Sequence, residues 1–294
     1  MDNQYFKISR PEPWLYSIKD RMEVYCWLIV GQRSALLLDA GYGIGDLPAV
    51  VRSLTDKPLT VLLSHGHADH VLGAAQFEQV LLHPADFELF NEHNGEKWRR
   101  KAVDAIQENK GKIDYSFDGF DFDGYLEKGG CEPTPLHESA EFDLGALTVS
   151  VIPMGGHTPG SVGLLIREQK VLLTGDASNR AEFMFMPESL KLSSYIDMLR
   201  RVSRLDFDIH YTGHQEKAYP KKWFAKYIKV AENAMAGKGK PMTIPGFEEY
   251  GEVLVSSIGG PVLSPAFCAV GYSREKLMRS ADRKESEVRS QKSE

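Results

Sequence analysis

The feature that most constrains this chain is a cluster of metal-ligand residues at positions 64–70, Ser-His-Gly-His-Ala-Asp-His. Three of the nine histidines of the chain fall within it. The cluster directly follows the apolar run Leu59–Leu63, which is typical of a buried strand. Residues i and i+2 of an extended chain point to the same side, so His65 and His67 can converge on one metal ion.

A second ion becomes possible if the chain turns into a helix after this loop, because Asp69 and His70 can then face it. Imidazole nitrogens and carboxylate oxygens suit zinc and other borderline divalent metals. Three further turns carry residues of the same kind, each after a predicted strand and each beside a glycine that allows a tight turn. They are Gly156-His157-Thr158-Pro159-Gly160-Ser161, Gly175-Asp176 and Gly213-His214.

The order of apolar patterns predicts a mixed α/β chain. Short apolar runs between turn residues predict strands, and apolar residues at helical spacing predict helices. The main predicted strands are Tyr25–Val30, Ala35–Leu38, Leu59–Leu63, Gln79–Leu82, Leu147–Ile152, Val162–Ile166, Val171–Leu173, Asp208–Tyr211, Val253–Ser257 and Ala266–Val270. The predicted helices are Asp46–Leu54, Pro84–Asn109, Ser189–Leu205 and Pro220–Met235.

Length and patterning predict one domain over residues 1–272, with a C-terminal helix and strands at 220–272 and a polar tail at 273–294. Residues 84–141 differ in character and are predicted to form a helical and loop insertion that acts as a lid. Its acidic and aromatic stretch 114–125 suits a surface loop. A calcium loop is not favoured there, because the EF-hand spacing is absent.

Composition narrows the function classes. Of 294 residues, 42% are apolar and 26% charged, and three scattered cysteines do not make a disulfide framework. No secretory pattern opens the chain and no apolar run approaches a membrane span, so a cytoplasmic location is expected. A net charge of −6 provides no basic footprint, and neither nucleic acid nor membrane is expected as a partner.

Taken together, the motifs His-x-His-x-Asp-His, Gly-His-Thr-Pro-Gly-Ser, Gly-Asp and Gly-His resemble the metallo-β-lactamase superfamily, and within it the glyoxalase II-like hydrolases. The resemblance covers about Tyr25–His214 and implies an αββα sandwich with the site at the edge of its two sheets. It implies two divalent ions, expected to be zinc. The implied ligands are His65, His67 and His157 for one ion, Asp69, His70 and His214 for the other, and Asp176 as the bridge.

The reaction implied is hydrolysis of a small ester, thioester, lactone or amide by a metal-bound hydroxide. Asp69 and His214 are the candidate catalytic residues, Asp69 through orientation of the nucleophile. Glutathione thioesters need basic groups, for which Lys221, Lys222, Arg274 and Lys276 are only candidates.

Other branches of the resembled family fit less well. A quorum-quenching lactonase would have Tyr where Asn179 stands, and the best-known zinc β-lactamases have Cys in place of Asp176. The nuclease branches would bring a basic surface and an extra domain.

Candidate substrate residues are Tyr42 in the Asp39-Ala-Gly-Tyr-Gly loop and Phe183 and Phe185 in the Phe-Met-Phe-Met run. Asp39 is either an acceptor for a ligand histidine or a turn former. The Phe-Met run is either an adaptable pocket wall or a core plug under the following helix.

Two other functions remain open. One is an iron-dependent oxidoreductase or dioxygenase of the same fold, and the other is a non-catalytic metal-binding sensor. A homodimer through the C-terminal strands or the lid is one arrangement the sequence allows.

Overall fold

The computed structural model describes residues 5–108, 117 and 119–277. The chain forms two compact units. The first comprises residues 1–153, 160–176 and 206–220, and the second comprises residues 154–159, 177–205 and 221–294. Within the described residues, no helix combines the length and apolarity that crossing a membrane would need.

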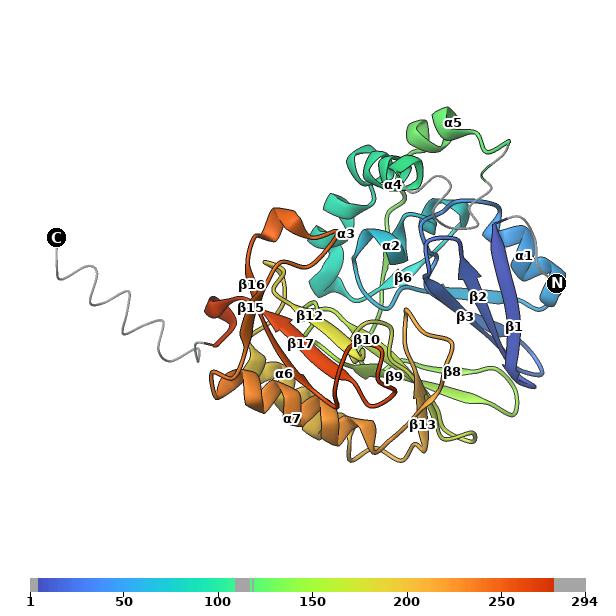
Figure 1. Ribbon diagram of the computed structural model, residues 1–294. Coiled ribbons are helices and arrows are strands. Elements are labelled where there is room, and N and C mark those ends of the chain that lie inside the picture. Colours follow the sequence, from blue (N-terminus) through green and yellow to red (C-terminus); the bar gives the residue numbers. More distant parts are fainter. Residues whose placement is uncertain (1–4, 109–116, 118, 278–294) are drawn as a thin grey trace, which may run out of the picture. The chain divides into compact units, whose positions relative to one another are not determined.

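The first unit is built on two β-sheets, both visible in Figure 1. The seven-stranded sheet has the order β1-β2-β3-β4-β5-β6-β7. Its strands are β1 (Phe6–Glu12), β2 (Leu15–Asp20), β3 (Tyr25–Val30), β4 (Ala35–Leu38), β5 (Leu59–Leu62), β6 (Leu81–Leu82) and β7 (Thr134–Pro135). The six-stranded sheet has the order β14-β13-β11-β10-β9-β8. Its strands are β8 (Glu141–Asp143), β9 (Thr148–Pro153), β10 (Val162–Ile166), β11 (Val171–Leu173), β13 (Ile209–Tyr211) and β14 (Tyr219–Pro220).

The core of this unit lies between the two sheets because alternate residues of their strands point inward. Trp27, Ile29, Leu36 and Leu38 from one sheet join one buried cluster with residues of β9, β10 and β11 from the other. β4, β5 and β6 run parallel, and so do β11 and β13. Their carboxyl ends are therefore the places where loops can carry functional side chains.

Helices cover the opposite face of the seven-stranded sheet. In α1 (Leu47–Leu54), Asp46 caps the first turn, and Leu47, Val50 and Val51 face the sheet. The short α2 (Ala68–Val71) follows the histidine loop. The remaining helices of the unit are α3 (Phe87–His93), α4 (Glu96–Glu108) and α5 (Phe122–Glu127).

The second unit holds a four-stranded sheet of order β12-β17-β16-β15, formed by β12 (Ala181–Met184), β15 (Lys240–Met242), β16 (Val253–Ile258) and β17 (Cys268–Tyr272). Two helices accompany it, α6 (Leu192–Val202) and α7 (Trp223–Met235). α7 contacts α6, β16 and β17, and both helices run along the lower edge of Figure 1.

The structure confirms the mixed α/β class and most predicted strands, four of them (β3, β4, β10 and β11) to the residue. The helix-like spacing over Pro84–Asn109 corresponds to α3 and α4, which Asn94 and Gly95 separate. The predicted helix start at Pro220 was wrong, since that residue pairs with Ile209 in a sheet. The stretch 114–125 ends in helix α5 rather than loop, and residues 114–116, 118 and 278–294 lie outside the described residues.

Candidate metal centre

The ligand-type residues of the first unit gather at the carboxyl ends of its parallel strands. β5 ends at Leu62, and the chain continues through Ser64 into the histidine loop and α2. Asp176 follows β11, and His214 follows β13. β5 is the parallel neighbour of β4, and β11 is the parallel neighbour of β13, so the ends of these strands bring distant sequence segments together.

Asp69, His70, Asp176 and His214 form one cluster, whose potential ligand atoms all lie within 4.8 Å of one another. His214 Nε2 is 3.0 Å from Asp176 Oδ2 and 3.4 Å from Asp69 Oδ2. His70 Nε2 is 3.3 Å from Asp69 Oδ2 and 3.6 Å from Asp176 Oδ1. These four residues, predicted as ligands, are thus brought together by the fold.

Close packing around this cluster requires glycine at position 213. A Cβ on Gly213 would lie 2.3 Å from Asp176 Oδ1 and 2.8 Å from His70 Cε1. Any side chain there would displace one of the two groups. The Gly-His motif therefore contributes both a candidate ligand, His214, and a glycine that leaves room for Asp176 and His70.

Asp39 is hydrogen-bonded to His70 of this cluster and to Ser64 of the histidine loop. It has a φ of 69°, a left-handed conformation that Asp tolerates better than most residues. Its carboxylate accepts the Ser64 N–H at 2.6 Å, the Ser64 hydroxyl at 2.9 Å and His70 Nδ1–H at 2.9 Å. Of the two interpretations from sequence, the structure places Asp39 in contact with a candidate ligand histidine.

These contacts select the tautomers of two histidines. His70 donates Nδ1–H to Asp39, which leaves Nε2 directed at the carboxylates. Because the Ser64 hydroxyl donates to Asp39, its oxygen accepts from His65 Nδ1–H at 2.9 Å. Both imidazoles therefore present Nε2 as the ligand atom, as is usual where an outer acceptor orients a metal-binding histidine.

Charges in the cluster shift one another's pKa values. Burial would raise the pKa of Asp69, but His70 and His214 outweigh it and hold that pKa well below its ordinary value. The pKa of Asp176 is lowered in the same way by His214 and His70. Burial would lower the pKa of His214, but Asp176 and Asp69 raise it to about 10. Both carboxylates are therefore ionised at neutral pH, whereas His214 holds a proton that a bound metal would displace.

The donor set fits a divalent metal. His70 Nε2 and Asp176 Oδ1 are buried and, among the described residues, make no hydrogen bond. Buried polar atoms normally have partners, and one cation would serve both. Two imidazoles and two carboxylates match the ligands of zinc and related metals.

His65 and His67 lie next to this cluster in the first unit. The ring centroids of His65 and His70 are 4.3 Å apart, and those of His65 and His67 are 4.8 Å apart. Both side chains are buried. The two rings lie close together as expected, although the loop bends at residues 64–66 and is not extended there.

His157, the remaining predicted ligand, belongs to the second unit. Its Nδ1–H donates to the Phe183 carbonyl at 3.1 Å, and Glu182 Oε1 lies 3.0 Å from the same nitrogen. Glu182 is buried on β12, and its other oxygen accepts the Asn179 N–H at 3.0 Å. Sequence reasoning missed Glu182, because no motif marks it in the Ala-Glu-Phe-Met strand.

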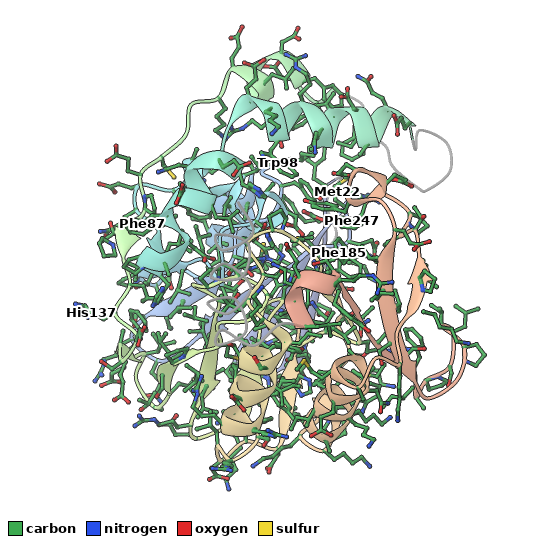
Figure 2. The ribbon with its side chains drawn as sticks, turned by 90° about the vertical axis from the view of Figure 1, so that its left-hand side faces the viewer. Met22, Phe87, Trp98, His137, Phe185 and Phe247 are labelled. Carbon is green, nitrogen blue, oxygen red and sulfur yellow. The ribbon has the colours of Figure 1, made fainter. Side chains whose placement is uncertain are left out.

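The candidate substrate residues occupy two aromatic clusters. Tyr42 packs beside Val103 and Tyr125, and its carbonyl accepts the Tyr125 hydroxyl at 2.7 Å. In the second unit, Phe183 and Phe185 contact Phe247, and Phe185 and Phe247 lie side by side in Figure 2 with ring centroids 5.7 Å apart.

Two of the candidate basic residues have structural contacts. The Lys276 ammonium is buried and donates to the carbonyls of Pro187 at 2.9 Å and Ser189 at 2.6 Å. Lys221 donates to the Leu205 carbonyl. Both ammonium groups thus tie loops of the second unit together.

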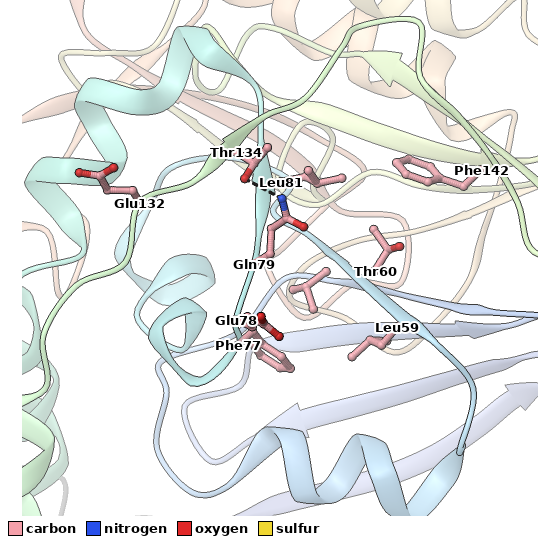
Figure 3. Close-up of a pocket in the computed structure, with 10 residues that line it drawn as sticks. Leu59, Thr60, Phe77, Glu78, Gln79, Leu81, Glu132, Thr134 and Phe142 are labelled. Atoms are coloured by element: carbon pink, nitrogen blue, oxygen red, sulfur yellow. Dashed lines mark hydrogen bonds between the residues drawn. The ribbon is translucent and has the colours of Figure 1, made fainter.

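A pocket of about 760 Å³ lies elsewhere in the first unit, beside the first residues of β5 (Figure 3). Leu59, Thr60 and Val61 line it, and two further lining residues are joined by a hydrogen bond from Gln79 to Thr134 Oγ1 at 3.0 Å. Its lining residues include no histidine. The pocket is therefore distinct from the histidine loop, which follows the last residue of the same strand.

Comparison with known proteins agrees with this geometry. The chain matches the Metallo-beta-lactamase superfamily over residues 20–214. It is 28% identical over 194 residues to "Acyl-coenzyme A thioesterase MBLAC2" of Gallus gallus, a match that covers 61% of this chain and 66% of that protein. It is 24% identical over 148 residues to "Hydroxyacylglutathione hydrolase GloC" of Haemophilus influenzae, covering 49% of this chain and 61% of that protein.

Solved structures show the same fold. An archaeal metallo-β-lactamase superfamily protein of Sulfolobus tokodaii aligns with a TM-score of 0.51 at 22% identity, covering 81% of this chain and 91% of that one. A metallo-β-lactamase of Pontibacter korlensis aligns with a TM-score of 0.53 at 14% identity, covering 78% and 99%. The αββα sandwich class expected from the sequence is thereby confirmed. The chain belongs to the metallo-β-lactamase superfamily.

Proposed function

We propose that this protein is a dinuclear metal-dependent hydrolase that cleaves a thioester of a small molecule. The observation that carries the proposal is the cluster of Asp69, His70, Asp176 and His214, with its ionised carboxylates and its buried atoms that lack hydrogen bonds. The two thioester-cleaving relatives support the choice of bond among the ester, thioester, lactone and amide that the motifs allow.

The proposed ligands follow the family's motif order. His65, His67 and His157 would hold one ion, Asp69, His70 and His214 the other, and Asp176 would bridge the two. Zinc is the proposed metal because the donors are imidazole and carboxylate. When bound, two such ions supply a nucleophile at neutral pH and Lewis acidity toward the developing oxyanion.

The exposure of the cluster indicates where substrate arrives. The His214 side chain is 36% exposed and that of Asp69 is 24% exposed, whereas that of His70 is fully buried. The thioester carbonyl therefore approaches from the side of Asp69 and His214. The ionised Asp69 carboxylate can accept a hydrogen bond from the attacking water and so orient it.

The aromatic side chains give the proposed substrate its apolar contacts. Tyr42 in the first unit and Phe183 in the second are the candidates, whereas Phe185 is 4% exposed and packs in the apolar cluster of the second unit. We also propose that residues 84–141 contribute the lid over the site, through helices α4 and α5.

The test is a substrate screen with the purified full chain. Acyl-coenzyme A and glutathione thioesters are compared with p-nitrophenyl esters, acyl lactones, β-lactams and phosphodiesters, with metal content measured on the same preparation. Thioester turnover with zinc bound supports the proposal. Iron in place of zinc, with oxygen consumption and no hydrolysis, would instead favour an oxidoreductase of the same fold. Bound metal without turnover of any substrate would favour a sensor.

A further inference from the structure

A buried carboxylate behind the histidine loop has no role in the chemistry described so far. Asp86 ends the short helical turn η2 (Pro84–Asp86), immediately before α3, and its side chain is fully buried. Its Oδ2 accepts the Gly66 N–H at 2.9 Å, and its Oδ1 accepts the Gly160 N–H at 2.6 Å. One side chain thus holds two loops that are far apart in the sequence.

Both loops carry candidate ligands. Gly66 is the residue between His65 and His67, and Gly160 follows His157 by three positions. Hydrogen bonds from amides to a carboxylate are shorter and stronger than those between neutral groups. Since both acceptors belong to one rigid group, a shift of either loop would break its bond to Asp86.

The glycines show how closely the carboxylate fits. A Cβ on Gly160 would lie 2.7 Å from Asp86 Cγ, and a Cβ on Gly66 would lie 3.1 Å from the Asp86 carbonyl oxygen. Glycine at these positions lets the loops approach the acid without a side chain between them.

A second contact from the same segment supports the arrangement. His93, the last residue of α3, accepts the Ala68 N–H through Nδ1 at 3.2 Å. Its ring centroid is 5.4 Å from that of His67 and 4.1 Å from that of Trp98. The segment from Asp86 to His93 therefore supports the histidine loop from behind at two backbone amides.

We propose that Asp86 is a positioning residue that sets the geometry of the His65–His67 loop for metal binding. This inference rests on the proposed metal centre. It predicts that the two ions respond differently. Loss of the Asp86 contacts lowers the affinity for the ion held by His65 and His67. The ion held by Asp69, His70 and His214 is affected less, because Asp39 orients His70 independently.

The test is zinc retention by the full chain under increasing chelator, compared between wild type, Asp86→Asn and Gly160→Ala. Asparagine has the shape of aspartate but a single acceptor oxygen, so one of the two amides loses its partner. Gly160→Ala pushes the carboxylate away without changing it. Asp143→Asn is the matched control, because Asp143 also accepts a backbone amide, that of Gly145 at 2.8 Å, through a side chain that is exposed.

The expected result is that both variants lose one zinc ion at a chelator strength about 10–100-fold lower than wild type, while the second ion is retained as before. The control should match wild type. Unchanged retention in Asp86→Asn and Gly160→Ala would overturn the inference, and so would equal loss of both ions together with a lower melting temperature in excess chelator. A wild-type chain that retains no zinc would instead refute the proposed metal centre itself.

Discussion

Two histidines in different units are held by buried carboxylates, and the pairs differ in instructive ways. In the first unit, Asp39 accepts Nδ1–H of His70 and also two groups of Ser64. In the second, Glu182 lies beside Nδ1 of His157, but the Phe183 carbonyl accepts the same proton. The proton of His70 thus goes to a carboxylate, whereas that of His157 goes to a backbone carbonyl with the Glu182 carboxylate 3.0 Å from the same nitrogen. Outer contacts of this kind fix which nitrogen is left for a metal.

The largest effect on activity is expected from substitution of Asp176, the residue proposed to bridge the ions. This change leaves Asp39 beside His70 and Glu182 beside His157. Asp176→Ala should lower thioesterase kcat/KM by more than about 100-fold, beyond what loss of an outer contact typically causes. Metal content should fall as well. Asp206→Ala, which removes an exposed partner of Lys170, is the matched control. Wild-type turnover in Asp176→Ala would rule out a two-metal mechanism.

The next change breaks the pair of the first unit. Asp39→Asn keeps the shape of the side chain but offers one acceptor oxygen to three donors. We expect metal affinity to fall about 10–100-fold, because His70 and Ser64 lose their orientation. Isothermal titration with zinc measures this. An affinity equal to wild type would show that the Asp39 contacts are only structural.

The corresponding change in the second unit should lower zinc affinity less. Glu182→Gln leaves the Phe183 carbonyl as acceptor for His157, so we expect at most about a 10-fold loss of zinc affinity, the lower end for an outer contact. Both variants are measured side by side by the same titration. A larger loss in Glu182→Gln than in Asp39→Asn would reverse the comparison.

The residues around His70 could be predicted from the sequence, whereas the partner of His157 could not. His65, His67, Asp69 and His70 are readable because ligand-type residues crowd one loop after an apolar strand, and Asp39 stands in a glycine-rich strand exit that draws attention. Glu182 sits inside a short strand between apolar residues, and only the fold places it beside His157. Asp86 likewise gains meaning only through Gly66 and Gly160.

The same limit applies to the fold. The strands β3 and β4 are continuous apolar runs and could be located to the residue, because both faces of each are buried. The hairpin of β1 and β2 was missed, since only Phe6 of β1 is buried and the strand contains Pro11. β1 pairs with β2, which in turn pairs with β3, and such tertiary support leaves no local pattern.

His210, a buried histidine of β13, differs from His70 in the direction of its pKa shift. We expect its titration to have the smallest effect of those predicted here, a change in the free energy of unfolding with pH. Carboxylates raise the pKa of His70, whereas burial lowers the pKa of His210 from 6.5 to about 3. Between these two values the unfolded chain binds more protons at this position, so stability falls as pH drops below 6.5. The free energy of unfolding should lose about 0.8 kcal/mol at pH 6 through His210.

Urea unfolding of wild type and His210→Gln at pH 7.5 and pH 6 measures this loss. The stability advantage of wild type over the variant should shrink by about that amount at the lower pH. An advantage that stays constant would show that the folded state accepts a proton on His210 as readily as the unfolded chain.

The most direct test of the central claim is thioester hydrolysis by the full chain before and after removal of metal, with metal counted on each sample. The account predicts about two zinc ions per chain in the active protein, loss of turnover when a chelator removes them, and recovery when zinc is returned. Turnover that persists in the stripped protein would contradict it.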